Sequence, residues 1–189
     1  MSRLGRGYPS PDILILAPRE REEPDPVAPV TDLIGPLLEA ALDCADLAIE
    51  PRAGRAALYP GAEVAWDDCC DGQVYARLIS MTPSGSPATG ARVVSPCGVL
   101  IWAATIGVGV IRCAAVVDDQ GRPPSPAALT ANTLQMTSDM TAVAEAINCC
   151  LAPQVGKLQM LRWDPLGPEG GCVGGEWSFT VLIDNCRCP

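Results

Sequence analysis

The sequence contains no histidine. This absence excludes Ser-His-Asp and Cys-His catalysis, histidine general bases and every metal site built with an imidazole. The ten cysteines include no C-x-x-C pair, so their spacing is not that of a zinc finger or zinc ribbon. The glycine-rich stretch at 167–175 lacks the Lys and the Ser/Thr of a phosphate-binding P-loop. We therefore expect a protein that is not an enzyme and that holds no cofactor and no metal ion.

Basic residues are also scarce, with 13 Lys and Arg against 22 Asp and Glu and a net charge of −9. A nucleic-acid-binding surface needs a basic patch or stripe, so this composition argues against one. The same acidic balance is compatible with DNA that passes nearby without binding, because acidic side chains repel phosphates.

No apolar run reaches the length of about 20 residues that a membrane helix needs. The longest, CGVLIWAATIGVGVIRCAAVV at 97–117, has an uncharged part of 14 residues at 98–111 that ends at Arg112. Its Val, Ile and Thr content favours a buried central strand of a sheet over a helix. Gly107 and Gly109 within it fit either a bulge or a close backbone approach.

The N-terminal part divides into an arm and a helix. Residues 1–30 are rich in proline and charge, a composition that does not form a packed core, and we expect no signal peptide there. Within this arm, residues 12–16 could add as a strand to a neighbouring sheet. Apolar residues at 3 and 4 spacing predict a helix over 31–49, and Pro36 near its first turn predicts a regular helix from Gly35 onward.

A second helix has the clearest periodicity in the chain. Ser125 is its expected N-cap, Pro126 its first residue and Pro153 its end. A helix packed on the sheet is the simplest interpretation, and a coiled-coil partner is the alternative. The apolar stripe consists of Leu129, Thr133, Met136, Met140, Val143, Ile147 and Cys150.

Alternating and apolar runs predict about five strands around these helices. The resulting order of arm, helix, three strands, helix and two strands indicates one α+β domain over 31–184. Its sheet is mainly antiparallel and covered by two helices, with a short cysteine-containing tail at 185–189. The expected strands are 63–66, 73–81, 92–117, 157–163 and 176–184, and the expected loops are 52–61, 82–90 and 164–175.

The cysteines and one acidic turn leave alternatives open. An even number of cysteines permits disulfides, but buried thiols are equally compatible and the pairing cannot be deduced. The turn with Asp67, Asp68 and Asp71 is the best candidate for a hard cation, although it lacks the EF-hand pattern and aspartates suit turns anyway. Cys172 is a candidate reactive thiol, with no base or positive group evident beside it.

Four segments resemble head-to-tail connector proteins of actinobacterial long-tailed phages. They are DDCCDGQVYARL at 67–78, GVLIW followed by GVIRC at 98–113, LQMTSDMTAVAEAINCC at 134–150 and GPEGGCVGGEWSFTVLID at 167–184. The order of elements is similar to that of tail terminator proteins, over about residues 31–184.

This resemblance implies a structural virion protein, assembled in the bacterial cytoplasm, with no membrane association. Tail terminators form a homo-oligomeric, hexameric ring that caps the tail tube and joins it to a neck or stopper protein. DNA passes through the lumen of such a ring without specific binding. The alternatives are another neck component (an adaptor or stopper), a thiol- or metal-dependent enzyme, and a secreted disulfide-stapled binding module.

A closed ring requires one surface patch to meet a different patch on the next subunit. We expect the arm and the two long loops at 82–90 and 164–175 to contact neighbouring subunits or the tail tube. Deletion of either loop should then leave a folded monomer that does not form rings. The candidate contact residues are Ile13, Leu14, Ser84, Gly85, Gly167, Glu169 and Cys172.

Overall fold

The computed structural model describes residues 30–184 except 62, 67–68, 85–93, 96–97 and 100. The arm at 1–29 and the tail at 185–189 therefore lie outside the described residues. The same holds for three of the candidate contact residues, which are Ile13, Leu14 and Gly85.

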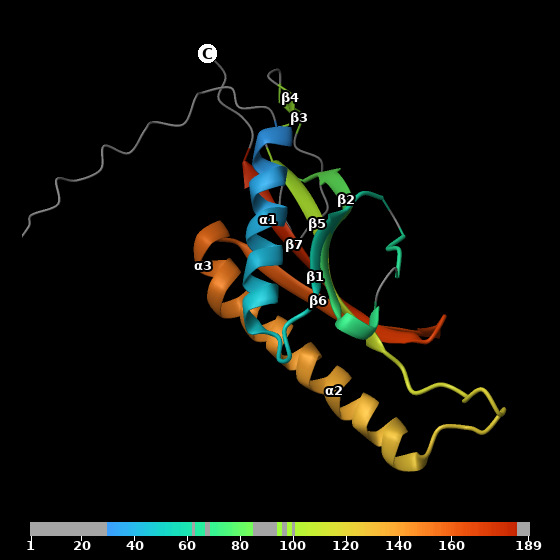
Figure 1. Ribbon diagram of the computed structural model, residues 1–189. Helices are drawn as coiled ribbons and strands as arrows, with labels where there is room; N and C mark the ends of the chain where they lie inside the picture. The colour runs from blue at the N-terminus through green and yellow to red at the C-terminus, as the bar shows by residue number, and fades with distance from the viewer. Residues whose placement is uncertain are drawn as a thin grey trace, which may run out of the picture.

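The middle part of the long apolar run forms β5, the central strand of a five-stranded sheet with the order β1-β2-β5-β7-β6 (Figure 1). The strand predicted over 92–117 is too long, because β3 and β4 pair separately and residues 114–117 are not in a strand. Neighbouring strands are antiparallel except β1 and β2, which are parallel. A separate pair, β3 with β4, is antiparallel. The predicted α+β fold with a mainly antiparallel sheet is confirmed. The strands span Arg55–Tyr59 (β1), Gln73–Pro83 (β2), Val94–Ser95 (β3), Gly98–Val99 (β4), Ile101–Cys113 (β5), Leu158–Glu169 (β6) and Cys172–Asp184 (β7).

The helices lie on one face of this sheet (Figure 1). α1 spans Val30–Ala48 and α2 spans Pro126–Glu145, which continues through a π-helical turn, Ala146–Leu151, into α3, Ala152–Val155. A single-turn 3-10 helix, Cys69–Asp71, precedes β2. The core between helices and sheet includes Leu37, Ala41, Ala45, Ile106, Val108, Val143, Ile147 and Phe179.

Alternation along the strands sends side chains to two different environments. Ile106 and Val108 of β5 enter the core beneath the helices, whereas Gly107 and Gly109, which alternate with them, face the other side of the sheet. Tyr75 of β2 also faces that side, in a smaller cluster with Cys69, Ile111 and Cys172. The sheet therefore has one face covered by helices and one face that is free to form a site.

The helix predicted over 31–49 is confirmed as α1, but both helices pass through a proline that the sequence suggests as a boundary, so a regular start at Gly35 and an end at Pro153 are wrong. α1 begins at Val30 and includes Pro36, which lies on its exposed side. Pro153 falls in the first turn of α3, a position where the missing N–H removes no interior hydrogen bond. The helix instead ends at Gly156, whose φ of 79° suits glycine.

The first edge of the sheet differs from the prediction. Residues 55–59 form β1 where the sequence predicts a loop, and residues 63–66 are not a strand. β1 is an edge strand with mostly exposed side chains, so its sequence carries little alternation. The 63–66 segment is held by a side chain instead, since Gln73 Nε2 donates to the carbonyl oxygen of Ala65 at 2.9 Å.

The predicted loop at 164–175 is also wrong. β6 extends to Glu169 and β7 begins at Cys172, so only Gly170 and Gly171 form the turn of the hairpin. Pro165 and Pro168 are accommodated because β6 is an edge strand, where a missing N–H removes no ladder bond to a further strand. Deletion of these residues would therefore remove parts of two strands rather than a loop.

Among the described residues, three disulfides connect the elements. Cys44–Cys150 joins α1 to the π-helical turn, Cys69–Cys172 joins the 3-10 helix to β7, and Cys70–Cys113 joins it to the end of β5. Cys149 is an exposed free thiol. The choice that the sequence leaves open between thiols and disulfides is thus resolved in favour of disulfides at these six positions.

Candidate functional site

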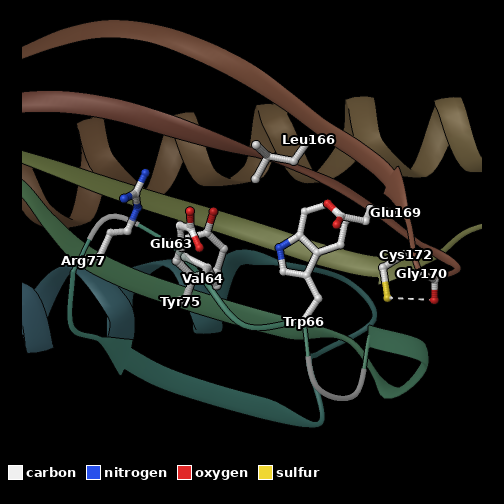
Figure 2. Close-up of a pocket in the computed structure, with 9 residues that line it drawn as sticks. All are labelled: Glu63, Val64, Trp66, Tyr75, Arg77, Leu166, Glu169, Gly170 and Cys172. Carbon is white, nitrogen blue, oxygen red and sulfur yellow. Dashed lines mark hydrogen bonds between the residues drawn. The ribbon is translucent and has the colours of Figure 1, made fainter.

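A hollow of about 610 Å³ lies over the sheet face that the helices do not cover (Figure 2). Its floor comes from β2, and its walls come from the segment after β1 and from the β6–β7 hairpin. The lining residues are Glu63, Val64, Trp66, Tyr75, Arg77, Leu166, Glu169, Gly170 and Cys172.

A buried ion pair crosses the floor of the hollow. Arg77 Nε and Nη2 donate to Glu176 Oε2 and Oε1 at 2.7 and 2.8 Å, and the two side chains are only 16% and 6% exposed. Arg77 Nη1 also donates to the carbonyl oxygen of Gly61 at 3.4 Å. Such a bidentate, charge-assisted pair neutralises both groups and fixes their orientation. The Glu176 carboxylate raises the pKa of Arg77, which opposes the lowering effect of burial.

The pair spans β5, because Arg77 lies on β2 and Glu176 on β7. It passes over Gly107, where an added Cβ would lie 2.6 Å from the Glu176 carboxyl carbon. An added Cβ at Gly109 would overlap the Tyr75 ring in the same way. Both glycines therefore serve a close approach, which confirms one of the two predicted reasons for them. The irregularity in the pairing of β2 with β5 lies elsewhere, in β2 between Leu78 and Ser80.

Tyr75 is fully buried at this floor and packs edge-on against Tyr59, with 6.0 Å between ring centroids. Three buried polar atoms in this region have no hydrogen-bond partner among the described groups: the hydroxyls of Tyr59 and Tyr75 and Oε1 of Gln73. Burial, together with the nearby Glu176 carboxylate, raises the pKa of Tyr75 well above its ordinary value. The Tyr75 hydroxyl consequently stays protonated at neutral pH.

The rim of the hollow is formed by Trp66 and the hairpin. Gly167 has a φ of 84°, and an added Cβ there would lie 3.2 Å from Cη2 of Trp66, so the indole packs closely against the hairpin. Glu63 and Glu169 are exposed at this rim. The aromatic wall and the two carboxylates are thus presented to solvent together.

This arrangement is suited to binding rather than to acid–base or nucleophilic chemistry. Cys172 is disulfide-bonded and 4% exposed, so it is not a free thiol. Tyr75 is held in its neutral form, and Arg77 is neutralised by Glu176. Within the described part of the chain, no group of three or more Cys, Asp or Glu side chains could hold a metal ion. Asp67 and Asp68 of the acidic turn lie outside that part.

The structure brings together some of the candidate contact residues. Glu169 and Cys172 line the hollow and Gly167 contacts its Trp66, whereas Ser84 is buried at the end of β2, where its amide donates to Ile101 O at 2.9 Å. Glu63, Trp66 and Glu176 also belong to this region, although no sequence pattern indicates them as members of a site. The one available signal is the alternation of β2, which places Tyr75 and Arg77 on the same face.

The outer part of α2 is a second unusual surface. Residues 126–138 contain no charged side chain, and Leu129 and Leu134 are 50% and 65% exposed. Thr130, Thr133 and Thr137 each donate their hydroxyl to the carbonyl four residues earlier, so these donors are already used within the helix. We refer to the exposed side chains of residues 126–138 as the α2 surface.

Comparison of the sequence with protein-family models and with curated proteins gives no match. Among the helices that the structure describes, none combines the length and apolar character needed to cross a membrane.

Proposed function

We propose that the protein is a structural subunit of the head-to-tail connector of a long-tailed phage. More specifically, it acts as a tail terminator, a homo-oligomeric and hexameric ring that caps the tail tube and joins it to a neck or stopper protein. The proposal starts from the resemblance of the segments at 67–78, 98–113, 134–150 and 167–184. In this role the protein is located in the virion, and DNA passes through the ring without specific binding.

The α2 surface is the observation that carries the assembly part of the proposal. An outward helix face of an acidic monomer normally bears charges that keep it in water. The core of a protein–protein interface is instead depleted of charge and contains apolar anchors. Because residues 126–138 are uncharged and Leu129 and Leu134 are exposed, this face is suited to contact with another subunit.

The two edges of the sheet support ring formation in a second way. β1 and β6 are the outer strands, and among the described residues neither pairs with a further strand. Both halves of β6 contain a pairing irregularity, between Met160 and Arg162 and between Leu166 and Glu169, and the second half also contains Pro165 and Pro168. These features discourage strand addition. The first half lacks prolines and exposes Leu161 at 49%. Two dissimilar edges fit the heterologous contacts of a closed ring.

Electron microscopy of the full chain mixed with purified tail tubes tests this proposal. We expect rings at tube ends, and we expect Leu134→Glu to abolish them because it places a charge in the interface core. Leu47→Glu is the matched control, since Leu47 of α1 is 64% exposed compared with 65% for Leu134. Normal rings from both variants would exclude the α2 surface as the interface.

A further inference from the structure

We propose that the hollow over the open sheet face binds a basic side chain, an arginine or a lysine, presented by a partner protein. The assignment of that partner to a phage connector rests on the function proposed above. The capture of a cationic group by the hollow does not, since it follows from the charges, rings and unpartnered polar atoms of the described residues.

The charges around the hollow favour a cation. Glu63 and Glu169 lie exposed on its rim, and Arg77 at its floor is already bound by both oxygens of Glu176. These four side chains carry a net charge of −2 at neutral pH. An anionic ligand would face the rim carboxylates and would have to displace Glu176 from Arg77, whereas a cation would gain two partners.

The walls of the hollow offer contacts for both the charged head group and the aliphatic stem of a basic side chain. Trp66 provides an indole, which is the strongest aromatic partner for a guanidinium or ammonium group. Val64 and Leu166 line the same hollow and can pack against the aliphatic stem that Arg and Lys share. Gly167 allows the hairpin to hold the Trp66 ring in place, because no side chain intervenes there.

The Tyr75 hydroxyl is the second feature that bears on the ligand. The Tyr75 side chain lines the floor of the hollow, and its hydroxyl is buried beside the Glu176 carboxylate without a hydrogen bond of standard geometry among the described groups. Buried polar groups are nearly always hydrogen-bonded to protein or to something bound. Arg and Lys side chains only donate hydrogen bonds, and a neutral tyrosine hydroxyl can accept one. A purely apolar ligand would leave this hydroxyl unpartnered.

A titration with N-acetyl-arginine amide tests the proposal, with N-acetyl-glutamine amide as the neutral probe of similar size. The readout is the indole N–H signal of Trp66 in the ¹H–¹⁵N spectrum of the full chain, identified through its loss in Trp66→Phe. We expect the arginine probe to shift this signal and the glutamine probe to leave it in place. High salt should weaken the effect, because the rim carboxylates are exposed.

Substitutions at the rim carboxylates test whether the arginine probe binds in the hollow. Glu63→Gln and Glu169→Gln should each weaken binding of the arginine probe by about two- to fivefold, the range for exposed ion pairs. Glu39→Gln is the matched control, because Glu39 is an exposed glutamate on α1, away from the hollow. Equal shifts from both probes, or equal binding in the rim variants and the control, would overturn the proposal.

The ring assay separates this proposal from the proposed function. Binding of the arginine probe at Trp66 by a chain that forms no rings would support the hollow and contradict the connector role. If the chain forms rings but the arginine probe does not shift its Trp66 signal, the proposed cation site is contradicted and the connector role is supported.

Discussion

Two glycines in the central strand determine what the open face of the sheet can hold. Gly107 leaves room for the Glu176 carboxylate and Gly109 for the Tyr75 ring. A strand so rich in β-branched residues would otherwise carry side chains at both positions. The open face therefore depends on two missing Cβ atoms as much as on the side chains that are present.

Gly107→Ala and Gly109→Ala should each lower the free energy of unfolding by about 1–3 kcal/mol, the usual effect of overpacking. Gly35→Ala provides a control of opposite sign. Gly35 lies in α1 with no heavy atom within 4 Å of an added Cβ, so alanine should stabilise the helix by about 0.5–1 kcal/mol. Urea unfolding of the three variants measures these differences. Unchanged stability in both β5 variants would contradict the close approach.

The raised pKa of Tyr75 predicts a stability that depends on pH in alkali. The folded state keeps the Tyr75 proton to higher pH than the unfolded state does, so the folded state binds more protons above pH of about 10. The free energy of unfolding should therefore fall as pH rises, by up to about 1.4 kcal/mol per pH unit for this group. Tyr75→Phe should remove that part of the slope. Parallel curves for the two proteins would show that Tyr75 titrates normally.

The site was only partly predictable at the residue scale. Alternation in β2 places Tyr75 and Arg77 on one face, and this holds in the structure. The partner of Arg77 could not be predicted, because Glu176 is 99 residues away. Their contact depends on how β2 and β7 are registered against β5, and strand registers are not encoded in local periodicity.

At the scale of elements, α2 is attached to the sheet through a second buried ion pair. Arg112 of β5 donates from Nε and Nη2 to Asp139 of α2 at 2.8 and 2.9 Å, and from Nη2 to Pro51 O at 2.8 Å. Gln135 adds a hydrogen bond to Asp139 at 3.1 Å. One helix, one strand and the loop after α1 are thus joined around the Arg112–Asp139 pair.

Asp139→Ala should destabilise the fold by about 3–5 kcal/mol, because it leaves the Arg112 guanidinium buried without its counter-charge. Asp164→Ala is the matched comparison, since Asp164 accepts from Arg162 at 2.8 Å but this pair is 39% and 75% exposed. Exposed pairs contribute about 0–1 kcal/mol. Thermal or urea unfolding distinguishes the two, and similar losses in both variants would contradict this account of α2.

The elements that the sequence predicts well are those with one apolar face. The predicted stripe is buried or half-buried from Met136 of α2 to Ile147 of the π-helical turn, whereas Leu129, Thr133 and Cys150 toward its ends are exposed. The alternation of β7 is a second such face. β1 escapes prediction because an exposed edge strand has no buried face, and its parallel pairing is set by backbone bonds such as Arg55 N to Gly72 O at 3.2 Å. The β6–β7 hairpin is not predicted, because its glycines and prolines are typical of loops, although an edge strand tolerates them.

At the scale of the whole molecule, the disulfides close long loops. Cys44–Cys150 and Cys69–Cys172 join residues 106 and 103 positions apart. Cross-links over such distances reduce the entropy of the unfolded chain, by about 4–5 kcal/mol each in the chain-entropy model. They also tie the α1 side and the open face of the sheet to elements distant in sequence.

The double variant Cys44→Ala/Cys150→Ala should therefore lower the free energy of unfolding by about 2–5 kcal/mol, the range seen when native disulfides are removed. Cys149→Ala serves as the control, because Cys149 is a free exposed thiol next in the chain to a bonded cysteine. Denaturant midpoints without reductant give the comparison. With reductant added to both proteins, the unmodified protein should match the double variant, because the remaining bridges are then open in both. A midpoint that is insensitive to both changes would contradict the bridging role.

The proposed function requires the subunits to assemble into a closed ring, and the mass of the full chain in solution measures that assembly. Light scattering on a size-exclusion column would be recorded for the protein alone and after addition of tail tube protein. We expect a closed ring with about six times the 19.7 kDa subunit mass, alone or on the tube. A persistent monomer that ignores the tube would contradict the terminator role.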